Sequence, residues 1–138
     1  MHTSFSIATR GPGLYELTRD VASWVARADL DEAVLTLFLR HTSASLVIQE
    51  NADPDVCTDL EAYFSRLVPP ASDPSMRYLR HILEGPDDMP AHIKAALLPV
   101  SLTIPVIDGR MALGTWQGIY LFEHRSASHR REVAAVLR

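Results

Sequence analysis

Short runs of aliphatic and β-branched residues, each ended by a turn signal, recur along the chain and limit what it can fold into. Such runs are typical of strands. They are SFSIAT (4–9), AVLTLFLRH (33–41), SLVIQE (45–50), VSLTIPV (100–106) and RMALGTWQGIYLFEH (110–124). The Asp108-Gly109 turn between the last two predicts a hairpin, and EVAAVLR at the C-terminus predicts a final strand or short helix.

Helical spacing appears in three places between these strands. Thr18 is a candidate N-cap for a helix through about Ala28, and Asp53-Pro54 starts a second helix that continues to Leu67. Pro90 opens a third, short helix, after an irregular stretch at 71–89. About seven clustered strands and two or three helices predict one α+β domain over residues 1–138.

Composition excludes several classes of protein. The formal net charge of −4 argues against nonspecific nucleic-acid binding, which needs a large cationic surface. Cys57 is the single cysteine, so an intrachain disulfide and Cys-rich zinc sites are excluded. No apolar run reaches a membrane-spanning length, and the first residues lack a signal-peptide pattern. We therefore expect a cytoplasmic protein without nucleic-acid or membrane partners.

Two histidines frame the most polar part of the irregular stretch. His81 and His92 bracket Glu84, Asp87 and Asp88, and the Gly-Pro pair at 85–86 gives a bend that brings the histidines towards each other. Neutral imidazoles with one carboxylate form a recurrent open metal site. The alternative is that the carboxylates are solvated loop charges, with Asp88 capping the helix that Pro90 opens.

Other candidate residues are ambiguous when each is taken alone. His41 ends a strand, where a histidine that bonds to the backbone is the common case. Alternation places Gln49 and Asn51 on one strand face and Glu50 on the other, where Glu50 is either a general base or a solvated charge. The arginines after the last long strand (125, 130 and 131) either bind phosphate or form surface salt bridges.

Three motifs together resemble the YjbQ family of small bacterial and archaeal proteins. They are HTSASLVIQENADP (41–54), HILEGPDDMPAHIKAALL (81–98) and IPVIDGRMALGTWQGIYLFEHR (104–125). The resemblance covers the chain from about residue 5 onwards. It implies a two-sheet β-sandwich of about seven strands with two to three flanking helices, assembled as a homotrimer. It also implies a secondary thiamine-phosphate synthase activity, which joins a pyrimidine pyrophosphate to a thiazole phosphate.

The family pattern recurs at most of the polar candidates, and this gives each an expected role. The expected metal ligands are His41, His81 and His92, with zinc as the first choice of metal and magnesium as the alternative. The expected catalytic residues are Glu50 as general base, with His41 and Asp88. The expected substrate-binding residues are Asn51 and Gln117, which would orient the substrate, and Lys94 and Arg125, which would neutralise phosphate.

The leading hypothesis is a trimeric enzyme that acts on a small phosphorylated molecule at a histidine-rich, metal-bound site. The alternative is a trimer that holds a metal or metabolite without catalysis. The two hypotheses differ in catalytic turnover. Only an enzyme would lose a reaction when its general base is replaced.

Overall fold

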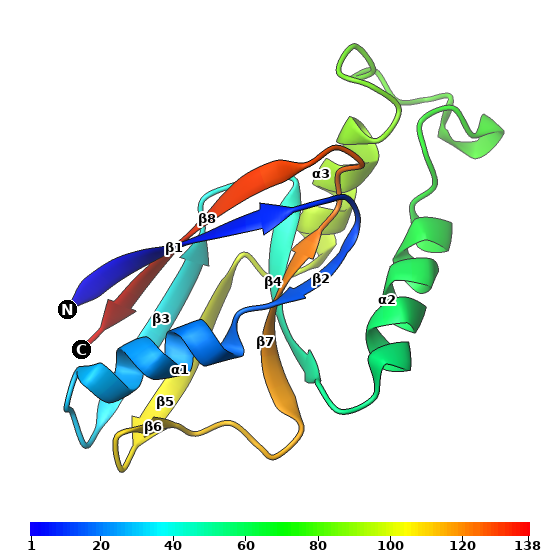
Figure 1. The fold of residues 1–138 in the computed structure, drawn as a ribbon. Helices are drawn as coiled ribbons and strands as arrows, with labels where there is room; N and C mark the ends of the chain where they lie inside the picture. Colours follow the sequence, from blue (N-terminus) through cyan, green and yellow to red (C-terminus); the bar gives the residue numbers. More distant parts are fainter.

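The computed structural model describes residues 1–138 as an α+β fold with two antiparallel sheets and three α-helices (Figure 1). The order in the five-stranded sheet is β1-β8-β3-β5-β6, and the order in the three-stranded sheet is β2-β7-β4. The strands are β1 (His2–Thr9), β2 (Gly13–Glu16), β3 (Ala33–Leu39), β4 (Ala44–Glu50), β5 (Ser101–Ile107), β6 (Arg110–Met111), β7 (Gln117–Glu123) and β8 (His129–Leu137). The helices are α1 (Thr18–Arg27), α2 (Pro54–Leu67) and α3 (Asp88–Leu97). The predicted α+β class is confirmed.

The hydrophobic core lies between the inner faces of the two sheets and the inner side of α1. Leu35 and Leu37 of β3 face Ile119 and Leu121 of β7, and Val21 of α1 is fully buried in the same cluster. Alternation along β3 sends every second side chain inward, because successive strand residues point to opposite faces. Each such aliphatic side chain stabilises the fold by about 1.5–3 kcal/mol relative to an exposed one.

The two ends of the chain are joined in the five-stranded sheet. β1 pairs antiparallel with β8, which settles the C-terminal segment as a strand. The Met1 ammonium donates a hydrogen bond to the Leu137 carbonyl at 2.9 Å, and both termini lie at the same edge of the molecule in Figure 1.

The strands divide between the sheets in a way that differs from the expected hairpin. The turn at Asp108-Gly109 joins β5 only to the two-residue β6, and the chain then crosses to the other sheet, where β7 pairs with β2 and β4. Strand β2, in the segment after the Gly-Pro-Gly turn, was not predicted. It is four residues long, and its pairing with β7 is a long-range contact that no local pattern encodes.

Helix α1 has the predicted extent but a different start. The N-cap position is Leu17, and the Thr18 hydroxyl makes no capping bond. This hydroxyl donates to Glu16 Oε2 at 2.8 Å and accepts from the Ile119 N–H at 2.8 Å. Thr18 thus ties the helix to β7 instead of capping it.

Helix α2 begins as the sequence predicts. The Asp53 carboxylate accepts a hydrogen bond from the Asp55 N–H at 2.9 Å, and Pro54 is the first helical residue. No residue of α2 is buried, and the helix stands to one side of the sheets (Figure 1). The Phe64 ring contacts Phe122 edge-on, with 5.6 Å between ring centroids.

The irregular stretch before α3 is confirmed over most of its length, with one 3-10 turn at Pro74–Met76. Helix α3 starts earlier than expected, at Asp88, so Pro90 lies inside its first turn. The N-cap position belongs to Asp87, which makes no capping bond with its side chain. The prediction that Asp88 is the cap is therefore wrong, and its carboxylate is available for other partners. None of the three helices combines the length and the apolar character needed to cross a membrane.

Candidate metal centre

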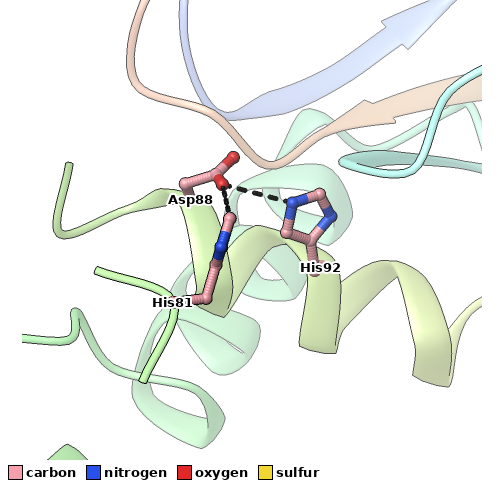
Figure 2. A group of neighbouring side chains, drawn as sticks. All are labelled: His81, Asp88 and His92. Atoms are coloured by element: carbon pink, nitrogen blue, oxygen red, sulfur yellow. Dashed lines mark hydrogen bonds and ion pairs between the residues drawn. The ribbon is translucent and has the colours of Figure 1, made fainter. Parts of the chain in front are cut away.

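His81, Asp88 and His92 converge at the start of α3 (Figure 2). Asp88 and His92 are four residues apart on one face of the helix, and His81 reaches them from the preceding loop. His81 Nε2 lies 2.7 Å, and His92 Nε2 3.2 Å, from the same Asp88 oxygen, Oδ2. The Asp88 side chain is 3% exposed, whereas His81 is 49% and His92 30% exposed. The group is therefore open to solvent on the imidazole side only.

The hydrogen bonds of His92 fix which of its nitrogens carries the proton. Nδ1 lies 2.8 Å from the Thr42 carbonyl oxygen, which can only accept, so Nδ1 is the donor. In the neutral ring Nε2 then presents a lone pair to the Asp88 carboxylate, which is also an acceptor. A second proton on His92 or a cation between the two atoms makes this contact favourable. An orienting bond from the distal ring nitrogen to a backbone carbonyl is typical of histidines that bind metal.

The donor set and its spacing fit a transition metal. The ligand atoms of the three residues lie within 4.8 Å of one another. Ligands about 2.0–2.1 Å from a tetrahedral zinc ion are about 3.3 Å apart. The 3.2 Å between His92 Nε2 and Asp88 Oδ2 matches this spacing, whereas the 2.7 Å between His81 Nε2 and Asp88 Oδ2 is a direct hydrogen bond that must lengthen when a metal binds. Two imidazoles and one carboxylate leave a coordination position open, and imidazole ligands favour zinc or iron over magnesium.

Arg125 holds the carboxylates of the site in place from behind. Its Nη1 donates to Asp88 Oδ1 at 2.7 Å, and its Nε donates to Asp87 Oδ2 at 2.9 Å. Burial alone would raise the pKa of Asp88, but hydrogen bonds from His81 and Glu84 and the nearby charge of Arg125 hold it below its usual value. The guanidinium is thus committed to the two aspartates, and its predicted contact with a substrate phosphate stays a prediction.

A cavity of about 290 Å³ adjoins His92 on the side towards β4. Its seven lining residues come from the start of β4 and from α3 and the segment after it: His41, Thr42, Ala44, His92, Ala95, Ala96 and Val100. The small side chains of α3 and β4 leave this space free. The cavity brings together two of the three predicted histidines, His41 and His92.

His41 itself lies outside the convergent group. Its Nε2 accepts a hydrogen bond from the Glu132 N–H at 2.9 Å, so this lone pair is already used. Burial, and then the charge of Arg131, lowers the pKa of His41 and favours the neutral ring. His41 therefore forms a wall of the cavity, and its expected role as a metal ligand is a prediction that this geometry does not favour.

The model of the UPF0047 protein YjbQ-like family matches residues 3–138. The chain belongs to this family. A UPF0047 protein from Synechocystis is 51% identical over 127 residues, which cover 92% of this chain and 84% of the relative. The UPF0047 protein YjbQ of Escherichia coli O157:H7 is 39% identical over 135 residues, covering 97% of this chain and 94% of the relative. The resemblance seen in the motifs is confirmed.

Solved structures of similar proteins have the same fold. A YjbQ/UPF0047 family protein from Clostridium acetobutylicum superimposes with a TM-score of 0.86 at 31% identity, and 99% of each chain is covered. A protein from Aeropyrum pernix K1 superimposes with a TM-score of 0.88 at 26% identity, covering 100% of this chain and 98% of that one. Both matches extend through the two sheets and all three helices.

The other residues expected at the site are at the opposite end of the three-stranded sheet. Glu50 and Asn51 follow the far end of β4, and Gln117 pairs with Glu50 at the start of β7. From Ala44 to Glu50, β4 spans about 20 Å at ~3.3 Å per residue. Within one chain these three residues therefore cannot contact a molecule bound at His81 and His92.

Lys94 also points away from the histidines. It follows His92 by two residues, and a helix turns by about 200° over two residues, so the side chains leave α3 on opposite sides. Lys94 lines a different cavity, together with His124. Its expected contact with a substrate phosphate stays a prediction.

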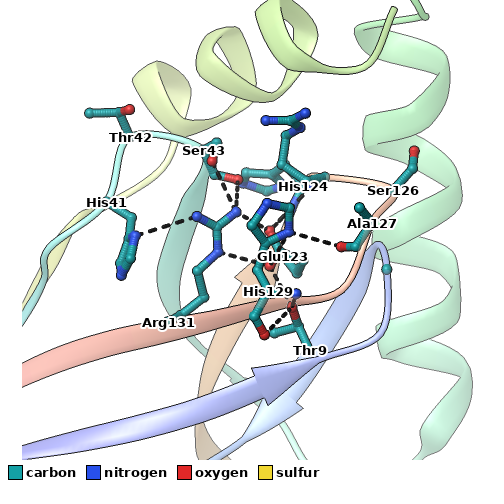
Figure 3. A network of polar contacts seen from close by, with 12 residues as sticks. Thr9, His41, Thr42, Ser43, Glu123, His124, Ser126, Ala127, His129 and Arg131 are labelled. Carbon is teal, nitrogen blue, oxygen red and sulfur yellow. Dashed lines mark hydrogen bonds and ion pairs between the residues drawn. The ribbon is translucent and has the colours of Figure 1, made fainter. Parts of the chain in front are cut away.

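Two groups of residues have roles in the structure that differ from those expected from the sequence. Glu84 Oε2 lies 3.3 Å from His81 Nε2, which makes it the exposed carboxylate nearest the open side of the group. Behind the cavity, Glu123 and Arg131 form a buried ion pair, in which Nε of Arg131 donates to Glu123 Oε1 at 2.8 Å (Figure 3). The Thr9 hydroxyl also donates to Glu123 Oε1, at 2.6 Å. The signal for Glu84 was its place between the two histidines, and the signal for Glu123 and Arg131 was the polar ending of the last long strand, which looks like a surface pattern.

Proposed function

We propose that this protein binds a divalent transition metal at His81, Asp88 and His92 and uses it to act on a small phosphorylated molecule. The observation that carries the proposal is the pair of imidazole nitrogens directed at one buried carboxylate oxygen, with the His92 lone pair facing that oxygen. Zinc is the metal that this donor set fits best. When bound, such an ion supplies Lewis-acid chemistry by polarising a phosphoryl or carbonyl oxygen.

The residues of the chain have separate tasks in this proposal. The cavity beside His92 accommodates the body of the substrate against small apolar side chains. Arg125 keeps Asp88 ionised and oriented, because both of its contacts to the aspartates require the carboxylate form. Glu84 is the exposed carboxylate nearest the open side of the group, and in its ionised form it accepts the proton of the attacking group. This role replaces the one expected of Glu50.

We expect Glu84→Gln to lower kcat by about 10²–10⁴-fold without lowering metal content, because removal of a general base affects only the chemical step. The measurement is release of phosphate or pyrophosphate from a panel of phosphorylated metabolites, including the two substrates of thiamine-phosphate synthase, with zinc, manganese or magnesium added. Glu32→Gln, which removes an exposed carboxylate far from the site, is the control. Full activity in Glu84→Gln together with a loss in Glu50→Gln would contradict the assignment and place the base at the other end of the sheet.

The non-catalytic alternative has one observation in its favour. The residues expected to orient a substrate, Asn51 and Gln117, do not reach the histidines within one chain. A binding protein would retain its metal through purification and show no turnover on any substrate of the panel.

Thiamine-phosphate synthase activity is part of the enzymatic proposal and rests on the family resemblance.

We further propose that the chain forms the homotrimer that the resemblance implies, through the outer face of the five-stranded sheet. Val34 and Phe38 of β3 are 43% and 49% exposed, and Val136 of β8 is 41% exposed. Val136 pairs with Thr36, between the two β3 residues, so the three side chains form one apolar patch. Exposed apolar patches of this kind mark association surfaces.

Phe38→Glu should therefore convert the trimer into monomers, because it places a charge within the apolar patch. Light scattering coupled to size exclusion measures the mass directly, and Tyr78→Glu, on an exposed loop, is the matched control. A wild-type protein that is monomeric at all concentrations would contradict this proposal without affecting the metal site.

A further inference from the structure

Lys94 is the one buried charged residue of the chain without a partner. The other three are paired: Asp88 with Arg125, and Glu123 with Arg131. Lys94 is 7% exposed, and no hydrogen bond or ion pair of its ammonium exists within the chain. The ammonium itself is not fully buried, and the charges of Glu61 and Asp87 act on it, but neither carboxylate accepts a hydrogen bond from it.

The Lys94 side chain lines a cavity of about 150 Å³ between α2 and α3. The polar residues of its wall are Glu61 and Ser65 of α2, Asp87 and Lys94, and His124 and Ser126 after β7. Since one water molecule occupies about 30 Å³ of liquid, the space holds roughly five waters or one small anion with a short substituent. A nucleotide is too large for it.

His124 lines the same cavity and carries a nitrogen without a hydrogen-bond partner. The residue is 2% exposed, and its Nε2 lies 2.9 Å from the Ser45 hydroxyl oxygen. Nδ1 is the only buried side-chain polar atom of the protein without a hydrogen-bond partner. Burial, and then the charge of Lys94, lowers the pKa of His124 to about 3, so the ring is neutral. When the Ser45 hydroxyl donates to Nε2, Nδ1 carries the proton and is a donor.

The two carboxylates in the wall attract the Lys94 ammonium through charge, but their hydrogen bonds come from other groups. Asp87 Oδ2 accepts from Arg125 Nε and from the Ser126 N–H, both at 2.9 Å. Glu61 Oε1 accepts from the Ser65 hydroxyl at 2.8 Å. Both carboxylates thus have donors of their own, whereas the Lys94 ammonium and His124 Nδ1 have no acceptor within the chain. The unmatched groups in this cavity are two N–H donors, one of them cationic.

We propose that this cavity is a binding site for a small oxyanion, a phosphate group, held by Lys94 Nζ and His124 Nδ1–H. The site is separate from the metal centre: it lies on the other side of α3, and Arg125 with its two aspartates stands between them. It does not depend on the proposed function, because neither donor belongs to the metal group. The phosphate is either free inorganic phosphate or the terminal group of a small phosphomonoester.

The test is calorimetric titration of the full chain, freed of metal with a chelator, with inorganic phosphate and separately with glycerol phosphate. We expect saturable binding that Lys94→Met weakens at least 10-fold and that His92→Ala leaves unchanged. Tighter binding of glycerol phosphate than of phosphate identifies the ester as the natural ligand, and the reverse order identifies the free ion. Lys94→Met is also expected to raise the melting temperature, because it removes an unpaired buried charge.

Two results would overturn this proposal. One is the absence of saturable binding of either probe by the folded wild type. The other is binding that His92→Ala abolishes and Lys94→Met preserves, which would place the anion at the histidine group. Because Lys94→Met is expected to be at least as stable as the wild type, a loss of binding in it cannot be attributed to unfolding. Metal binding is measured independently, so failure here leaves the proposed function standing.

Discussion

Asp88→Asn is expected to weaken zinc binding by more than 100-fold, beyond the ~10–100-fold loss that outer-shell changes produce. Asp88 is the ligand on which the two imidazoles converge, and its second oxygen is held by Arg125. Asparagine keeps the shape of the side chain but removes the negative charge that attracts the cation. The measurement is a competition titration against a chromophoric chelator.

Asp87→Asn is the matched control for that loss. It removes the same charge one residue earlier, where the carboxylate contacts Arg125 and the Ser126 N–H and no histidine. We expect its effect to stay within the ~10–100-fold range of a supporting residue. Equal losses in both variants would mean that zinc responds to the general negative field at this end of α3 and that Asp88 is no ligand.

Arg131→Met is expected to lower the free energy of unfolding by about 3–5 kcal/mol, the cost of leaving a buried charge without its partner. Glu123 is fully buried, and both of its carboxylate oxygens accept from Arg131. Chemical denaturation at neutral pH measures the loss. Arg130→Met is the control, because that neighbour is exposed and bonds only the Ser6 hydroxyl, so a change within about 0.5 kcal/mol is expected. If Arg131→Met also changed the free energy of unfolding by no more than about 0.5 kcal/mol, the ion pair would make no net contribution to stability.

The pH dependence of this effect has a definite sign. Burial by itself raises the pKa of Glu123, but the hydrogen bonds from Arg131 and Thr9 overcome it and hold the pKa below its usual value. A depressed folded-state pKa contributes stability above the unfolded-state value of about 4.3 and loses it as the pH falls further. Without Arg131, burial raises the pKa of the carboxyl instead. The difference in stability between the wild type and Arg131→Met should therefore start to shrink above pH ~4.3, where the buried carboxyl of the variant takes up a proton, and shrink further below it as the wild type loses its own contribution.

Local sequence signals predicted much of the fold. The Asp53-Pro54 start of α2 was correct because capping chemistry depends on adjacent residues. The strands at 33–39 and 44–50 followed from alternation and β-branched content. The assignment of these strands to different sheets was beyond such signals. It depends on pairings such as β1 with β8, whose partners are more than a hundred residues apart in sequence.

The site was predicted in part, for a similar reason. The histidine pair around Gly85-Pro86 was recognisable because the bend and both ligands are close in sequence. The distance of Glu50 from that pair within one chain could not be predicted, because it follows from the direction of β4, which the motif does not contain. Arg131 and Glu123 looked like exposed charges at a strand end, and only the packing of β1 and β8 over that end shows that they are buried.

The central claim is that His81, Asp88 and His92 hold a metal ion. The most direct test is the metal content, by mass spectrometry, of tag-free protein and of folded His81→Ala and His92→Ala variants. Our account predicts near-stoichiometric zinc, or another transition metal, in the wild type and its loss in both variants. A folded wild type that carries no metal even after reconstitution would contradict it. The group would then be a hydrogen-bonded pair of histidines on an aspartate, held together by a proton.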